Sequence, residues 1–292
     1  MSHVHVVAGI SFDVLGIVAL AGVLHAGWNA AAHAITDRMA AQVTIAAAYT
    51  IAAAPVAMAA PTPDRGAWPF LVASALMHLV YTAQLVRSYR LGDFGHAYPV
   101  ARAVAPVIVV GYSVAVLGEH TSARQWIGVA LLCLGIAGVA VGRPPGACRP
   151  SRSALLAAIG TGCCIAVYTL IDAVGVRRSE SIAGYLGWMF LLQGPLLLAG
   201  LAAAIPPRRI WVRVRSFLGI GLASGLVSFV AYAAVIWAQA HSPNATGAIA
   251  AIREVGVVIA ALLGRALYRE PLGGARSVGA LIAFAGIVTL SL

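Results

Sequence analysis

The sequence contains no lysine, few acidic residues and few cysteines, and these shortages already exclude several classes of protein. Charged residues make up 10% and hydrophobic residues 61% of the 292 residues, and the mean hydropathy is +0.92. Soluble domains carry roughly 25% charged residues, so these side chains are too few to form a polar surface around a chain of this size. Water is therefore not the main solvent, and an integral membrane protein is predicted.

All 19 basic residues are arginines, and they give the chain a formal net charge of +10. Most of them stand in short breaks between apolar runs, where arginine contacts lipid headgroups and influences topology. No basic stripe with interleaved aromatic residues is present, so nucleic acid is not an expected partner. The expected partners are membrane lipid and a small-molecule solute.

The four cysteines indicate neither a metal site nor a redox site, because they form no C-x-x-C pair and no histidine stands at zinc-ligand spacing. They are better interpreted as small buried apolar residues. P-loop, dinucleotide-binding, G-x-S-x-G and H-E-x-x-H motifs are absent from any suitable context. No metal, cofactor or ATP-driven step is therefore expected. The N-terminal apolar run lacks a basic region and a cleavage site, so it is predicted to be a retained first helix.

Ten apolar stretches have about the length of a membrane-spanning helix, which needs roughly 20 residues. Breaks at charges, glycine and proline place the first five at 12–34, 42–60, 69–89, 95–117 and 125–142. The other five fall at 154–175, 182–205, 216–238, 245–267 and 275–291. The most arginine-rich breaks between them are 143–152 and 206–215. The predicted fold class is an all-α integral membrane protein of about ten transmembrane helices.

The two sets of five helices repeat one sequence pattern. A constant offset of 151 residues aligns Arg102 with Arg253, Glu119 with Glu270, Gly128 with Gly279, and Gly135 with Gly286. Two five-helix repeats, residues 12–142 and 154–292, are therefore predicted. Because five is an odd number, the second repeat is inverted relative to the first, as in many secondary transporters whose solute site lies between the halves. This pattern favours transport over catalysis or sensing.

Four ionisable side chains fall well inside predicted spans, where a central charge costs about 2.5–3.5 kcal/mol. They are Arg102, Asp172, Arg253 and Glu254. Arg102 and Arg253 would bind a carboxylate or phosphate of the solute in bidentate fashion, with Glu254 beside them. The alternative is structural, with Arg253 paired internally to Glu254 or Asp172. Neighbouring residues on a helix do not face each other, so a pair between Arg253 and Glu254 is the less expected form.

The first helix carries a polar stripe made of His25, Trp28, Asn29 and His33, whose spacing places them on one face. Lining of a solute cavity by Trp28 and Asn29 is favoured over a hydrogen-bonded seam between helices. His25 is a candidate proton carrier. A metal site is not expected, because His25 and His33 lie two turns apart.

Other spans supply further candidates for the cavity. Tyr98 begins the helix that carries Arg102, and Tyr168 shares a face of the sixth helix with Asp172, the second candidate proton carrier. Secondary lining residues are His33, His78, Tyr81, Gln84, Ser228 and Tyr232. Glu119 and Glu270 end the fourth and ninth helices, where they are predicted to lie at water level and to cap helices or fix loops.

Two long runs of the sequence resemble the two halves of the EamA-like drug/metabolite transporter superfamily. They are LGDFGHAYPVARAVAPVIVVGYSVAVLGEHTSARQWIGVALLCLGIAG and AAIREVGVVIAALLGRALYREPLGGARSVGALIAFAGIV, and LHAGWNAAAH is similar to that family's first helix. The resemblance implies two inverted five-helix repeats and a central cavity lined by helices 1, 3, 4, 6, 8 and 9. It also implies peripheral last helices in each half, and secondary transport that is often export of amino acids, other metabolites or drugs.

The combined prediction is a secondary carrier in the plasma or inner membrane that exports a small polar metabolite or drug-like solute by alternating access. A polytopic membrane enzyme is one alternative, although the nine acidic residues form no catalytic cluster. A sensor or assembly subunit that does not transport is another. Loops after odd-numbered helices hold 13 of the 19 arginines, which places both termini outside, whereas the family has both in the cytoplasm. Orientation, the coupling ion and a homodimeric state are left open.

Overall fold

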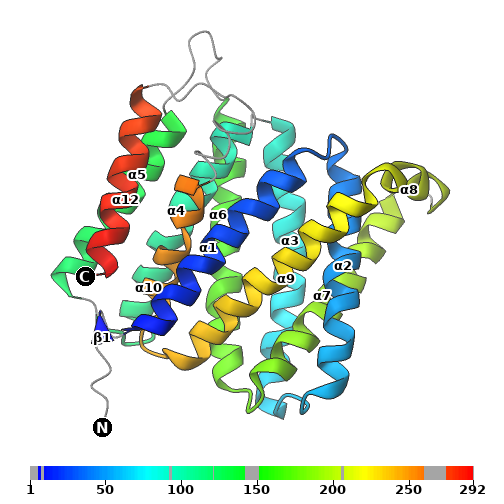
Figure 1. The fold of residues 1–292 in the computed structure, drawn as a ribbon, viewed down its shortest axis with the longest axis horizontal. Helices are drawn as coiled ribbons and strands as arrows, with labels where there is room; N and C mark the ends of the chain where they lie inside the picture. The colour runs from blue at the N-terminus through cyan, green and yellow to red at the C-terminus, as the bar shows by residue number, and fades with distance from the viewer. Residues whose placement is uncertain are drawn as a thin grey trace.

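The computed structural model describes residues 6–7, 10–91, 94–120, 122–141, 151–204, 207–259 and 274–291. Nearly all of these residues lie in helices, which form the elongated bundle of Figure 1. Two short strands, β1 (Val6–Val7) and β2 (Ile10–Ser11), pair in antiparallel fashion immediately before the first helix.

The first half contains five long helices that begin and end within four residues of the predicted positions. They are α1 (Phe12–His33), α2 (Arg38–Ala59), α3 (Trp68–Leu91), α4 (Phe94–Ala115) and α5 (Ala123–Val141), with the 3-10 helix η1 (Arg65–Ala67) before α3. Asp37 caps α2 by accepting a hydrogen bond from the Met39 N–H at 3.0 Å, because free amides at a helix start need acceptors.

The second half contains the elements α6 (Arg152–Arg177), α7 (Ile182–Ala204), α8 (Pro207–Val214), η2 (Arg215–Phe217), α9 (Leu218–His241), α10 (Thr246–Arg253) and α12 (Gly274–Ser291). The break predicted at 206–215 is therefore a helix, begun by Pro207 in the first position, where proline is favourable. The predicted helix 245–267 is not continuous, because α10 ends at Arg253. Residues 260–273 lie outside the described part of the chain.

Seven helices of the described residues are long and apolar enough to cross a membrane, namely α1, α2, α3, α4, α6, α7 and α9. Two shorter apolar stretches, Ala123–Val139 in α5 and Ser277–Leu290 in α12, accompany them. The chain is therefore a multi-pass membrane protein. The prediction of about ten spans is met in part, because α5 and α12 are short and α10 is interrupted.

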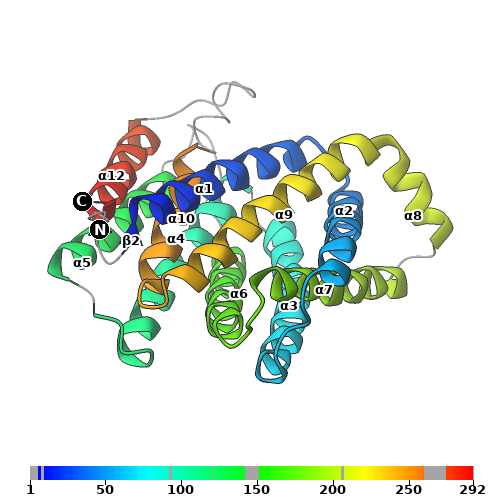
Figure 2. The same ribbon diagram turned by 60° about the horizontal axis from the view of Figure 1, so that its bottom comes forward.

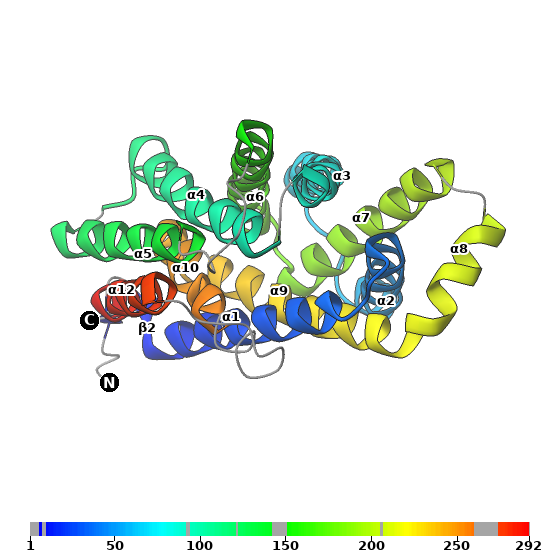
Figure 3. The same cartoon turned by 90° about the horizontal axis from the view of Figure 1, so that it is seen from above.

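Helices α5 and α12 pack against each other at one end of the molecule (Figures 1 and 3). A Cβ atom on Gly135 would lie 2.6 Å from the Gly279 carbonyl oxygen, and one on Gly128 would lie 3.0 Å from that of Gly286. Glycine is needed here because the two backbones approach too closely for a side chain. The order of these contacts also shows that the two helices run antiparallel.

The centre of the bundle is formed by helices from both halves. Helix α1 contacts α9 and α10, whereas α6 contacts α3 and α4. Viewed from above, α3, α4 and α6 lie on one side of α1 and α9, and α2, α7 and α8 lie at the end away from α5 and α12 (Figures 2 and 3). The buried polar side chains described below come mainly from these central helices.

Candidate functional site

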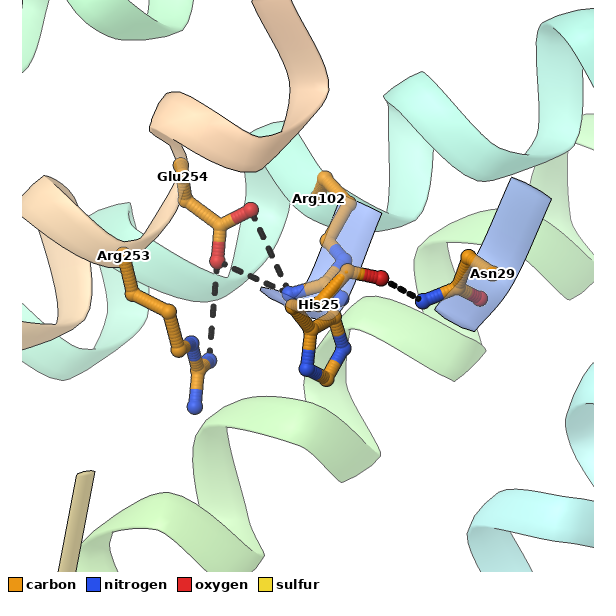
Figure 4. A network of polar contacts seen from close by, with 5 residues as sticks. All are labelled: His25, Asn29, Arg102, Arg253 and Glu254. Atoms are coloured by element: carbon orange, nitrogen blue, oxygen red, sulfur yellow. Dashed lines mark hydrogen bonds and ion pairs between the residues drawn. The ribbon is translucent and has the colours of Figure 1, made fainter. Parts of the chain in front are cut away.

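The centre of the candidate site is an ion network of Arg102, Arg253 and Glu254, which we call the arginine cluster (Figure 4). Arg102 Nη1 lies 3.2 Å from Glu254 Oε1 and 3.4 Å from Oε2, and Arg253 Nη2 lies 3.5 Å from Oε1. The three residues are 5%, 3% and 1% exposed. The repeat-related arginines therefore meet around one carboxylate, and the cluster has one more positive than negative charge.

The contact between Arg253 and Glu254 depends on the end of α10. Glu254 occupies the C-cap position, and its N–H donates back to the carbonyl oxygens of Ala251 and Ile252. The helix stops there, so the two adjacent side chains no longer diverge as they would inside a continuous helix. The pair between Arg253 and Glu254, which the sequence made the less expected form of the structural alternative, is therefore present.

Helix α1 contributes His25, Trp28 and Asn29 next to the arginine cluster. His25 lies beside Arg102 and interacts electrostatically with both arginines (Figure 4). The His25 and Trp28 rings meet edge to face, with centroids 5.0 Å apart. The Asn29 amide nitrogen donates to the His25 carbonyl oxygen at 2.7 Å, so one of its donor groups is used within its own helix.

Two buried donors in this part of the site have no acceptor among the described residues: Trp28 Nε1 and Arg253 Nε. Tyr98 lies one helical turn before Arg102, and the Arg102 guanidinium carbon lies 5.3 Å from the centre of the Tyr98 ring. This arrangement places a cation over an aromatic face. The arginine cluster thus combines a net positive charge with one Arg253 N–H that has no acceptor among the described residues, and it lies against the Tyr98 ring.

A second polar group, the Asp172 cluster, consists of Asp172 on α6, Tyr185 on α7 and Tyr232 on α9. The Tyr232 hydroxyl donates to Asp172 Oδ2 at 2.5 Å, and the Tyr185 hydroxyl donates to Oδ1 at 3.0 Å. Asp172 is 1% exposed, and no described arginine or histidine lies within ion-pair distance of it. The proposed structural pairing of Arg253 with Asp172 is therefore not formed.

Aromatic rings surround the Asp172 cluster. His78 on α3 stacks on Tyr168 with ring centres 4.2 Å apart, and its Nδ1 lies 2.9 Å from the Ser74 carbonyl oxygen. Tyr81 packs edge-on against Tyr168 at 5.6 Å. Tyr168 interacts electrostatically with Asp172 and with all three members of the arginine cluster. It therefore lies within range of both charged groups.

The other sequence candidates occupy less central positions. Gln84 lies against α6, where a Cβ atom on Gly160 would be 3.4 Å from its Nε2. Ser228 is half-buried on α9, one turn before Tyr232. The side chain of His33 and all of Glu270 lie outside the described part of the chain.

Sequence patterns missed one partner of the Asp172 cluster, Tyr185, and did not show which helix Glu119 caps. Tyr185 has no charged neighbour in sequence, and only its distance from Asp172 in the folded chain identifies it as a partner. Glu119 is 8% exposed, and its predicted capping role is confirmed. It accepts hydrogen bonds from the N–H groups of Thr246 and Gly247 at the start of α10.

Comparison with known proteins identifies the second half of the chain. Residues 152–292 match the model of the EamA-like transporter family. This half is an EamA-like unit. The predicted resemblance is thereby confirmed for these residues, and the match indicates a membrane transporter of the drug/metabolite type.

The EamA-like chain also shares its fold with solved structures, 28 of which match. One is a crystal structure that superimposes with a TM-score of 0.72, at 18% sequence identity over 96% of this chain and 98% of the other. At this identity the match shows the fold alone. No curated protein sequence matches the chain.

Proposed function

We propose that this EamA-like protein is a secondary carrier that moves a small polar solute with a negatively charged group across the cell membrane. Transport proceeds by alternating access between two inverted five-helix repeats, residues 12–142 and 154–292, and its physiological direction is export from the cell. The arginine cluster binds the anionic group at the junction of the two halves.

The observation that carries this proposal is the excess positive charge of the arginine cluster. Arginine stays protonated inside proteins, so Arg102 and Arg253 remain cations while Glu254 neutralises only one of them. An uncompensated charge deep in a membrane protein is costly unless a partner or water meets it. A carboxylate or phosphate of a solute supplies that partner and also accepts from the free Trp28 and Arg253 N–H groups.

The packing of the helices supports the inverted repeat. In this arrangement α1 corresponds to α6, α2 to α7, α3 to α9, α4 to α10 and α5 to α12. The contact of α3 with α6 then has its counterpart in the contact of α9 with α1. The contact of α2 with α9 likewise has its counterpart in that of α7 with α3. The close pair Gly128–Gly286 likewise exchanges with Gly279–Gly135. Such exchange is expected of two halves related by a two-fold axis, and it provides two near-equivalent states for transport.

The remaining candidates have distinct roles in this carrier. Trp28, Asn29, Tyr98 and Tyr168 line the path of the solute, and His78, Tyr81 and Tyr232 enclose its aromatic side. Asp172 carries the coupling proton, because a buried carboxylate without a cationic partner can alternate between charged and neutral forms. His25 is the second candidate for proton transfer.

A ligand screen on the purified protein tests the proposal, because a ligand stabilises the folded state that binds it. We expect carboxylates or phosphates to raise the thermal midpoint of the wild-type protein, and amines or neutral sugars to leave it unchanged. Arg102→Gln and Arg253→Gln should lose this stabilisation. Arg65→Gln, which removes an exposed arginine from the turn before α3, should keep it.

Transport itself is then measured in proteoliposomes by counterflow of the radiolabelled anion found in the screen. Wild-type and Arg65→Gln protein should accumulate label, and the two cluster variants should not. The proposal is wrong if folded Arg102→Gln and Arg253→Gln proteins both transport the anion at the wild-type rate, or if only cationic compounds stabilise the protein.

A further inference from the structure

A second polar network joins the two halves at the end of the bundle where α9 ends and α10 begins (Figure 1). The Glu119 carboxylate accepts from the Thr246 N–H at 3.0 Å and from the Gly247 N–H at 3.3 Å. Arg177 at the end of α6 donates to the Gln239 carbonyl oxygen at 3.3 Å, to the Gln239 side-chain oxygen at 3.4 Å and to the Thr246 hydroxyl. We call these contacts the Glu119–Arg177 clasp.

The turn after α4 directs Glu119 toward the second half. Gly118 has a φ of +70°, a conformation that glycine adopts without strain. The Glu119 N–H donates back to the Ser113 carbonyl oxygen at 3.0 Å, which closes this turn. The carboxylate consequently extends from the first half to the start of α10. A negative charge is favourable there because of the helix dipole and the free amides.

Helix α10 connects the clasp to the arginine cluster. It begins at Thr246 and ends at Arg253, so its two ends are separated by about 10 Å at 1.5 Å per residue. Its first turn is held by Glu119 and Arg177, and its last residue is one of the two proposed anion ligands. A short helix held at one end transmits a movement of that end to Arg253 and Glu254.

We propose that Glu119 is a positioning residue that holds α10 against the first half in one transport state and must release it before that side of the carrier opens. Arg177 assists by fixing Thr246 and the end of α9, and it also attracts Glu119 electrostatically. This inference rests on the proposed function for its purpose, because closing one side matters only in a carrier. Its structural content, a releasable contact on one side, is testable without any solute.

The test measures from which side a buried position can be reached. The four cysteines are first replaced by alanine (C133A, C148A, C163A, C164A), and Ala250→Cys is then introduced on α10, where position 250 is 2% exposed. A membrane-impermeant maleimide is added to vesicles of defined orientation. With Glu119→Gln, we expect labelling to become about tenfold faster from the side on which Glu119 lies, the change expected when a charge-assisted hydrogen bond is lost.

Three variants distinguish release of the clasp from general loosening. Glu180→Gln removes an exposed carboxylate after α6 and should leave labelling unchanged. Glu119→Asp keeps the charge and should restore at least part of the slow labelling. Arg177→Gln should accelerate labelling from the same side, and it provides an independent measurement if Glu119→Gln fails to fold.

Equal acceleration from both sides, or no acceleration in a folded Glu119→Gln protein, would overturn the proposal and leave Glu119 as an ordinary helix cap. The outcome is separate from the test of anion binding. If labelling shifts to one side while no anion stabilises the protein, the clasp stands and the solute assignment fails. If an anion stabilises the protein but labelling does not shift to one side, the clasp proposal fails and the anion site stands.

Discussion

The two buried polar clusters differ in the sign of their charge and in the groups that balance it. The arginine cluster holds two cations around one carboxylate, through contacts of 3.2 to 3.5 Å. The Asp172 cluster holds one carboxylate between the Tyr185 and Tyr232 hydroxyl groups, with the Ser74 hydroxyl as a further neutral partner, and no cation is in ion-pair contact among the described residues. One site therefore has an excess positive charge, and the other has an excess negative charge whenever Asp172 is ionised.

The two clusters therefore differ in whether their charge can change. We propose the arginine cluster as a fixed anion anchor and Asp172 as a group that switches between charged and neutral forms. A guanidinium cannot lose its proton at accessible pH, so both arginines of the arginine cluster remain positively charged. A buried carboxyl group can lose its charge by taking up a proton. Tyr168 interacts electrostatically with both clusters, so it connects the proposed anion site with the proposed proton carrier.

The largest expected effect is on the arginine cluster. Among the described residues, Glu254→Gln removes the one carboxylate between the two arginines, and breaking a buried ion pair costs about 3–5 kcal/mol. We expect a large fall in the thermal midpoint of the purified protein. Because a bound anion would replace the missing carboxylate, the anionic ligand should raise the midpoint of this variant more than that of the wild type.

The exposed Glu180→Gln variant is the matched control and should keep the wild-type midpoint in both conditions. If Glu254→Gln is as stable as the wild type, the two arginines do not depend on this carboxylate. The assignment of excess positive charge would then be incorrect.

The next effect concerns Asp172, which faces His78 on α3, Tyr185 on α7 and Tyr232 on α9, and lies one turn from Tyr168 on its own helix. Asp172→Asn keeps the shape but cannot exchange a proton. We expect transport driven by a pH gradient to fall by at least tenfold, while counterflow without a gradient stays within about twofold, because solute binding and the conformational change remain.

His25→Gln provides the comparison, since His25 is the second proton candidate. If this variant loses gradient-driven transport and Asp172→Asn keeps it, the proton is carried beside the arginine cluster. The distinction between an anchoring cluster and a switching cluster would then no longer hold.

A smaller effect is expected from the hydroxyl groups of the Asp172 cluster. Tyr232→Phe removes the shorter of the two hydrogen bonds to the carboxylate, 2.5 Å against 3.0 Å for Tyr185. A hydrogen bond to a charged group contributes about 1.5–3 kcal/mol, so stability should fall by about that amount. Tyr185→Phe should lower stability less. An unchanged thermal midpoint in both variants would mean that these two hydroxyl groups do not stabilise the Asp172 carboxylate.

Sequence alone predicted most of the fold because a membrane restricts how a chain can satisfy its backbone. Spanning helices need about 20 apolar residues, so α1 and α6 could be located from hydropathy within a few residues. Helix α8 was missed because its alternating arginines and apolar residues resemble a loop in hydropathy. The end of α10 was missed because the apolar run continues on both sides of Arg253, Glu254 and Gly256, so hydropathy predicts one unbroken helix there.

The candidate site was predictable only in part, because hydropathy locates helices but does not specify which of their side chains meet. The repeat relates Arg102 to Arg253, but the carboxylate between them is reached only after α10 ends at Glu254. Glu119 could be predicted as a cap from its place at a helix end, yet the helix it caps lies 127 residues further along the chain. Contacts of this kind depend on how the helices pack, which hydropathy does not specify.

The smallest predicted effect is the most selective. Trp28 Nε1 is buried and finds no acceptor in the described part of the chain, so Trp28→Phe keeps the aromatic packing, removes one unused donor and should leave the thermal midpoint unchanged. If the solute accepts from this donor, its dissociation constant should rise about fivefold, or roughly 1 kcal/mol. Trp188→Phe is the matched control, because Trp188 Nε1 also lacks an acceptor but the ring packs against Trp68, 5.2 Å away. Equal affinity losses in the two variants would show that the indole acts through packing, and only a loss confined to Trp28→Phe places the anion beside the arginine cluster.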